Sequence, residues 1–215
     1  MTSRSLASGR LLAEIVHAIV LAVWLGCIVM AAAVAARVFP MMRELEPTLP
    51  AYAEYPGGNH HLIVAGHVGE FVFTALAVVQ FLGVILASLT LLLIVGRLGL
   101  SPRRLVTMLR AGGIGLAAMC VSAQLLWLDP AMNAELRAYW TNAREGNVEQ
   151  AEIHRDAFRD KHPMATNLLG GSALGLLIAI GAQVASLSAT RRRFAADAAP
   201  GEPELEEPSL GRGML

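Results

Sequence analysis

The stretch FVFTALAVVQFLGVILASLTLLLIV, from Phe71 to Val95, gives the clearest indication of the fold class of this chain. Its polar residues are Thr74, Gln80, Ser88 and Thr90. A surface helix of a soluble protein carries a polar face along one side, and this segment has none. A bilayer core about 30 Å thick needs about 20 helical residues to cross it. The segment is long enough and apolar on every side, so we predict a membrane-spanning helix.

Three further segments have the same character. They run from Leu11 to Phe39, from Leu105 to Leu128 and from Ala165 to Ala189. The first is longer than the apolar region of a signal peptide, which has about 7–15 residues, so we expect an uncleaved span. Together the segments predict an all-α, polytopic membrane four-helix bundle. Its transmembrane domain covers residues 11–190, after an N-terminus of residues 1–10.

The composition supports a lipid environment and excludes several other classes. Of the 215 residues, 55% are hydrophobic and 16% are charged, whereas a soluble domain has about 25% charged residues. The 17 Lys and Arg residues balance the 17 Asp and Glu residues, so the basic surplus of a nucleic-acid-binding protein is missing. Two cysteines do not make a disulfide scaffold. We expect the lipid bilayer as the main partner, with other membrane proteins or a second copy as further partners.

Arginines indicate the orientation. Those next to span ends on one side are Arg4, Arg10, Arg97, Arg103, Arg104, Arg191, Arg192 and Arg193. On the other side the basic residues of the long loop are mixed with acids. Because short cytoplasmic loops are rich in Lys and Arg, we predict an inner-membrane protein with both termini in the cytoplasm.

The segments between the spans differ in character. The stretch Pro40–Asn59 is rich in proline and glycine and predicts a broken, extended connection. The outer loop 130–163 predicts two short amphipathic helices lying on the outer membrane surface, with Asp129 as the first N-cap and Pro130 at the first helical position. Acids and prolines in the tail 191–215 predict disorder.

Two ionisable residues lie inside the first span. Glu14 and His17 are three residues apart and share a helix face, and Trp24 follows on the same face. Ionisable groups within a membrane are costly and suggest a function. In one interpretation the side chains of Glu14 and His17 reach the membrane interface or hydrogen-bond within the bundle. In the other, His17 is an axial haem or copper ligand with Glu14 and Trp24 beside it.

A second candidate site lies on the outer side. His67 and Glu70 are three residues apart at the start of the second span, and His162 precedes the fourth. Imidazole and carboxylate groups are plausible zinc or copper ligands. The alternative is a set of interfacial histidines with a capping acid. No catalytic motif is visible, so we favour a protein that is not an enzyme.

Small and polar residues within the spans suggest how the helices meet. Gly112 and Gly113 in the third span and Gly171 and Gly175 in the fourth let helices approach closely, either within one chain or across a dimer. Cys27 and Cys120 lie at similar depths, either as small apolar residues or as a pair. Gln80 and Gln124 either hydrogen-bond within the bundle or line the path of a small transporter.

The order of several short motifs resembles a known family. The first span contains VHAIVLAVWLG with His17, Trp24 and Gly26, and AGHVGEFVF opens the second span at Ala65. The motif LDP ends the third span, and FRDKH precedes the fourth. In this order they resemble the transmembrane protein 205-like family of four-span proteins over residues 10–190. Ala165 stands where that family places a serine.

The resemblance implies an architecture rather than a chemistry, because the family has no defined biochemical activity. The first span also resembles, more distantly, copper-resistance protein D and the four-helix haem-binding protoporphyrinogen oxidase. That likeness implies haem or copper at His17. The leading hypothesis is a membrane-embedded structural, interaction or accessory protein; the alternatives are a haem- or copper-binding redox protein and a small transporter.

Overall fold

Long helices make up the described part of the chain, which in this computed structural model covers residues 3–56, 59–97, 101 and 104–197. The elements are α1 (Ser3–Leu45), η1 (Pro50–Tyr52), α2 (His60–Gly96), α3 (Leu105–Ala123), the π-helical turn η3 (Gln124–Leu128), α4 (Asp129–Arg144) and α5 (Val148–Asp197). In these residues four helices are long and apolar enough to cross a membrane, with α3, η3 and α4 forming one of them. The predicted all-α four-helix membrane bundle is confirmed.

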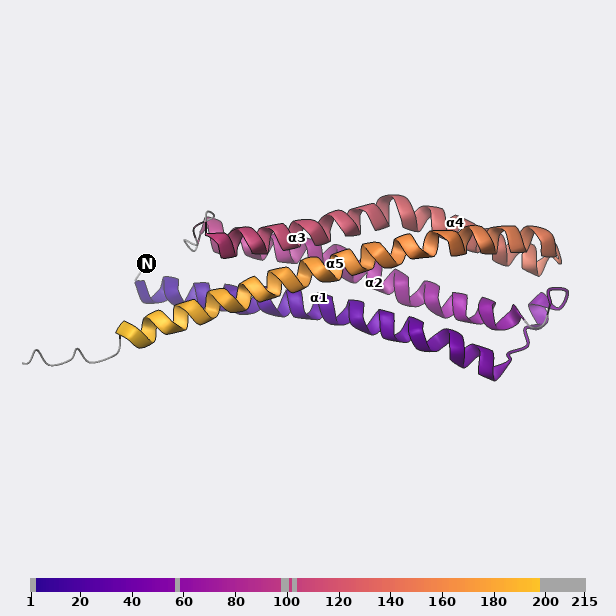
Figure 1. Ribbon diagram of the computed structural model, residues 1–215, viewed down its shortest axis with the longest axis horizontal. Helices are drawn as coiled ribbons and strands as arrows, with labels where there is room; N and C mark the ends of the chain where they lie inside the picture. Colours follow the sequence, from indigo (N-terminus) through magenta and orange to yellow (C-terminus); the bar gives the residue numbers. More distant parts are fainter. Residues whose placement is uncertain (1–2, 57–58, 98–100, 102–103, 198–215) are drawn as a thin grey trace, which may run out of the picture.

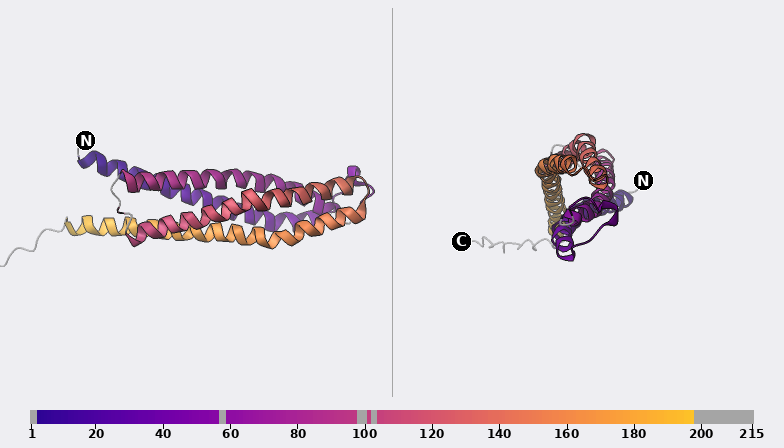
Figure 2. Two further views of the ribbon diagram at one scale, coloured as in Figure 1. Left: turned by 90° about the horizontal axis from the view of Figure 1, so that it is seen from above. Right: turned by 90° about the vertical axis from the view of Figure 1, so that its right-hand side faces the viewer.

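The helices pair as two antiparallel hairpins. The first hairpin consists of α1 and α2, and the second consists of α5 and the continuous helix α3–η3–α4. Figure 1 shows the start of α1 and the end of α5 at the same end of the bundle, which we call the terminal end; the opposite end is the loop end. The end-on view in Figure 2 shows the helices surrounding a common axis. Packing is denser within each hairpin than between them.

The helices extend beyond the predicted spans. The 37 residues of α2 measure about 55 Å at a rise of about 1.5 Å per residue, and a bilayer core is about 30 Å thick. The helix is therefore longer than the hydrocarbon core is thick. Helix α5 runs to Asp197, so the predicted tail starts later than residue 191, and residues 198–215 lie outside the described residues.

The outer loop 130–163 is helical as predicted, but its helices are not separate surface helices. Leu128 has the helical dihedrals φ −78° and ψ −48°, so Asp129 continues a helix instead of capping one. The second predicted helix is the first part of α5, which passes through Pro163 without interruption. The physical reason is burial, because α4 and α5 cover each other's apolar faces there. Tyr139, Trp140 and Ala151 belong to that shared core.

The connection between α1 and α2 is shorter than predicted. Helix α1 continues through Pro40 to Leu45, where an extended chain was expected. His60 hydrogen-bonds to the backbone of the remaining loop at two points. Its Nδ1 accepts from the backbone N–H of Leu49 (3.1 Å), and its Nε2 lies 3.0 Å from the carbonyl oxygen of Tyr52. The loop therefore packs against α4 through Tyr52 and Tyr55.

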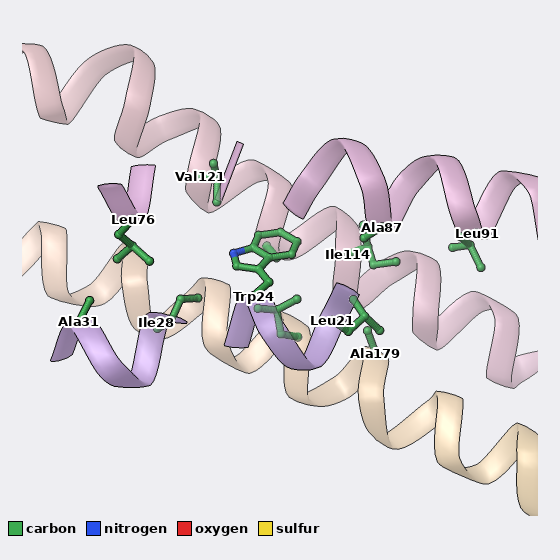
Figure 3. Packing of buried hydrophobic residues seen from close by; sticks show 12 residues of the cluster. Leu21, Trp24, Ile28, Ala31, Leu76, Ala87, Leu91, Ile114, Val121 and Ala179 are labelled. Atoms are coloured by element: carbon green, nitrogen blue, oxygen red, sulfur yellow. The ribbon is translucent and has the colours of Figure 1, made fainter. Parts of the chain in front are cut away.

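Trp24 occupies the centre of the membrane core. Figure 3 shows its indole in the middle of the cluster, with Leu76 and Val121 on one side and Ile114 and Ala87 on the other. A Cβ atom at Gly83 of α2 would come within 2.6 Å of the Trp24 ring. The missing side chain at Gly83 therefore makes room for the indole between α1 and α2.

Three of the four glycines singled out in the sequence lie at contacts between helices. Gly113 and Gly175 face each other across α3 and α5, where a Cβ on either would lie 2.4 Å from the other's carbonyl oxygen. Gly171 faces the Sγ atom of Cys120. At Gly112 a Cβ would meet nothing within 4 Å, so this glycine is not at a helix contact. Gly113, Gly171 and Gly175 thus lie at contacts between helices of one chain. Both cysteines are free.

Candidate functional site

A cavity of about 260 Å³ opens between the two hairpins, toward the loop end. Residues of α2, of η3 and α4, and of α5 line it, and Phe39 of α1 lies at its edge. These elements belong to different hairpins. The two hairpins pack against each other more loosely than the helices pack within each hairpin. The cavity thus occupies the seam where the fold is least tightly packed.

The π-helical turn η3 gives the cavity two of its polar side chains. On an α-helix of 3.6 residues per turn, Gln124 and Asp129 would point about 140° apart. In η3 the backbone N–H of Asp129 donates to the carbonyl oxygen of Gln124, the i to i+5 bond of a π-helix. Both residues line the cavity. Single π turns within α-helices often mark functional sites.

Hydrogen-bond acceptors gather in this cavity. Gln124 is only 6% exposed, and its Oε1 atom has no hydrogen-bond partner among the described residues. The carboxylates of Glu70 from α2 and Asp129 from α4 are half-buried in the wall. An unpaired buried acceptor costs about 1–3 kcal/mol. The carboxylates of Glu70 and Asp129 in the wall favour a ligand that donates hydrogen bonds.

The rest of the lining is mainly apolar. Its larger side chains are Phe39, Phe73, Met132, Leu136, Phe158 and Leu169. Small-molecule sites typically combine apolar walls with a few polar groups that orient the ligand. The described lining holds two carboxylates and no lysine or arginine, so its charge favours cations.

The predicted metal ligands are divided between two places. Glu70 and His162 line the cavity, with His162 exposed and leaning on Phe158 (ring centroids 6.1 Å apart). His67 instead stacks on Trp140, with ring centroids 3.8 Å apart. No group of three His, Cys, Asp or Glu side chains in the described residues could hold a metal ion. The geometry does not assemble His67, Glu70 and His162 as a ligand set.

A second polar cluster lies nearer the terminal end and joins three helices. Arg110 of α3 donates to both carboxylate oxygens of Glu14 of α1, at 3.0 and 3.4 Å. Gln183 of α5 donates to the same carboxylate at 2.8 Å and to the Glu14 carbonyl oxygen at 3.0 Å. Arg110 is 0% and Glu14 is 4% exposed. Glu14 therefore connects the hairpins through a buried ion pair.

His17 hydrogen-bonds within the first hairpin and not to Glu14. The hydroxyl of Thr90 donates to the carbonyl oxygen of Leu86 (2.7 Å), so its oxygen accepts from Nδ1–H of His17 at 2.7 Å. The Nε2 atom of His17 is then an acceptor, and it has no partner among the described residues. The side chain is fully buried.

The donor set around His17 does not fit the predicted haem or copper site. Its free Nε2 suits a metal, but Glu14 is committed to Arg110 and Gln183 instead of supporting the imidazole. The Trp24 ring packs against α2 at Gly83, where a Cβ atom would lie 2.6 Å from it. The cationic guanidinium in this cluster opposes a metal cation. Glu14, His17 and Trp24 are thus parts of the bundle's core in this structure.

Other buried polar atoms in the bundle also lack partners. Gln80 is fully buried, and neither of its amide atoms has a hydrogen-bond partner in the described residues, so it does not bond to Gln124. The Nε1 atom of Trp24 and the hydroxyl of Ser172 share this state. These groups supply polar atoms between the Glu14 cluster and the cavity.

The sequence analysis did not single out Arg110 or Gln183, and it assigned Asp129 only the role of a helix N-cap. Arg110 stands inside the apolar run of α3, and an arginine within a span is itself a signal for a paired acid. Gln183 carries a weaker signal, because a single amide near a span end also suits the interface. Nothing in the sequence indicates the π turn that brings Asp129 beside Gln124 in the cavity.

A comparison of this chain with protein-family models, with curated proteins and with solved structures finds no match.

Proposed function

We propose that this chain is a membrane-embedded accessory protein whose working site is the cavity between its two hairpins, where it binds a small amphipathic molecule. The observation that carries the proposal is a cavity of about 260 Å³ that combines mainly apolar walls with the half-buried side chains of Glu70 and Asp129. Burial of an acceptor next to apolar walls is costly unless a ligand or water satisfies it. The four long apolar helices agree with the four-span architecture that the resemblance to the transmembrane protein 205-like family implies.

A small transporter is the second candidate. The unpartnered polar atoms of Trp24, Gln80 and Ser172 support it, because a transport path needs polar groups along the bundle axis. Loose packing between the hairpins supports it too, since transport requires one part of the bundle to move against another.

Filling the cavity tests the proposed site. Gly69 lines the cavity, and a side chain there meets no atom within 4 Å of its Cβ. We expect Gly69→Leu to weaken binding of 2-phenylethylamine and 2-phenylethanol by at least about tenfold, because the added side chain occupies the ligand volume. Binding is measured by calorimetry on the purified protein in phosphatidylcholine nanodiscs.

The matched control is Gly115→Leu on α3. Gly115 is exposed, and its Cβ position is equally free of neighbours, but it lies outside the cavity lining. Binding should stay at the wild-type level in this variant. Equal affinity in Gly69→Leu and Gly115→Leu for both compounds, or no binding to the wild type, would contradict the proposed site.

We also propose the inner membrane as the location, with both termini in the cytoplasm, on the basis of the arginine distribution. Glu149, exposed at the start of α5, is the labelling position of choice. Gly146 in the neighbouring turn has φ +75°, and a Cβ atom there would lie 2.5 Å from the Oε2 atom of Glu54, so a cysteine at this position is strained. In a chain with Cys27 and Cys120 replaced by alanine, Glu149→Cys should react with an impermeant thiol reagent on intact cells. Reaction only after lysis would reverse the orientation.

A further inference from the structure

We infer that the ligand of the cavity is an organic ammonium ion with an apolar body, an inference that rests on the proposed function above. The cavity wall holds two carboxylates, those of Glu70 and Asp129, and its other polar residues include Gln124, Asn133 and Thr74. An ammonium group has three donors and no acceptor. It can therefore satisfy this set, whereas a carboxylate or phosphate ligand would face repulsion from both acids.

The aromatic walls favour the same class of ligand. Phe39 of α1, Phe73 of α2 and Phe158 of α5 line the cavity from three different helices. Aromatic faces attract cations within about 6 Å of the ring centroid, and the attraction grows when water is excluded. The same rings bury an apolar body. A ligand with a cationic head and a hydrophobic body uses both properties.

An organic cation fits better than a bare metal ion. A metal ion needs several ligands converging on one point, and no group of three His, Cys, Asp or Glu side chains in the described residues does so. Here the acceptors come from Glu70 on one hairpin and from Gln124 and Asp129 on the other. The volume of about 260 Å³ is close to the lower limit of drug-sized sites, about 300 Å³. It suits a molecule with one aromatic ring or a short alkyl chain.

A matched pair of ligands tests this inference on the wild-type protein. 2-Phenylethylamine and 2-phenylethanol have nearly the same shape, but at neutral pH only the amine carries a positive charge. We expect the amine to bind at least about tenfold more tightly, because hydrogen bonds to charged groups are worth more than neutral ones. Calorimetry in phosphatidylcholine nanodiscs gives both dissociation constants. Equal affinity for the two compounds would overturn the inference while leaving the proposed site intact.

Charge-neutralising variants test whether the carboxylates of the cavity cause the preference for the amine over the alcohol. Asp129→Asn and Glu70→Gln should each weaken amine binding by about tenfold and leave alcohol binding unchanged. Glu149→Gln, which removes an exposed acid outside the cavity, should change neither. An amine preference that survives both cavity variants would contradict the inference, and so would displacement of the amine by millimolar calcium.

A further arm distinguishes the source of the ammonium group. Phosphatidylethanolamine carries a primary ammonium on a lipid headgroup, and a free amine carries it in solution. Competition by phosphatidylethanolamine added to the nanodiscs supports a lipid ligand. If phosphatidylethanolamine does not compete and tight amine binding is retained, the result supports a free amine.

Discussion

Arg110→Met will lower the free energy of unfolding by about 3–5 kcal/mol, the cost of leaving one partner of a buried ion pair alone. The guanidinium of Arg110 is fully buried and donates to both carboxylate oxygens of Glu14. Without it the Glu14 carboxylate stays in the bundle core with only Gln183 as a donor. Unfolding in mixed micelles with increasing sodium dodecyl sulfate measures the loss.

The double variant Glu14→Gln with Arg110→Met isolates the cause. Removing both charges of a buried pair is often nearly neutral, so the double variant should recover most of the stability that Arg110→Met loses. Gln183→Leu should cost less, about 0.6 kcal/mol, the average for a hydrogen bond between membrane helices. If Glu14→Gln and Arg110→Met lowered the free energy of unfolding by additive amounts, the ion pair would not be the interaction that joins the hairpins here.

Gly113→Ala will destabilise the bundle by about 1–3 kcal/mol, the usual cost of overpacking a tight contact. The added Cβ would lie 2.4 Å from the carbonyl oxygen of Gly175 and 2.9 Å from the backbone nitrogen of Ala179. Backbone atoms cannot rotate away as a side chain can, so α3 and α5 must separate. The same unfolding assay measures the effect.

The neighbouring glycine provides a control with the opposite sign. A Cβ at Gly112 meets nothing within 4 Å, and alanine is favoured over glycine within a helix by about 1 kcal/mol. Gly112→Ala should therefore be neutral or stabilising. Similar losses for Gly112→Ala and Gly113→Ala would show that helix flexibility, and not the contact of α3 with α5, governs both positions.

The four spans followed from composition and run length alone. The segment Phe71–Val95 can be stable as a helix only where lipid covers its side chains, and the same holds for the other apolar runs. Helix ends were harder to predict. Pro40 and Pro163 are strong local breakers, yet both lie inside helices, because packing at the loop end outweighs the loss of one backbone hydrogen bond.

The candidate site was predictable only in part. Glu70 and His162 were recognised as site residues, and both line the cavity. Their expected partner His67 points elsewhere and stacks on Trp140. Residues 67 and 70 are three apart, which places them on roughly the same face, but that face spans both the cavity and the contact with α4. Which neighbour each side chain meets depends on the other hairpin.

The lipid environment, the number of spans and their antiparallel order can be predicted from the sequence, because they follow from apolar length and from short connections. The partners of the buried polar groups depend instead on how the helices pack against one another. Glu14 lies close to His17 in the chain but pairs with Arg110, which is 96 residues away. The physical reason is that helix periodicity sets which residues share a face, whereas packing between helices decides what that face meets. The cavity arises in the same way, from a seam between hairpins and a π turn that brings Gln124 and Asp129 together.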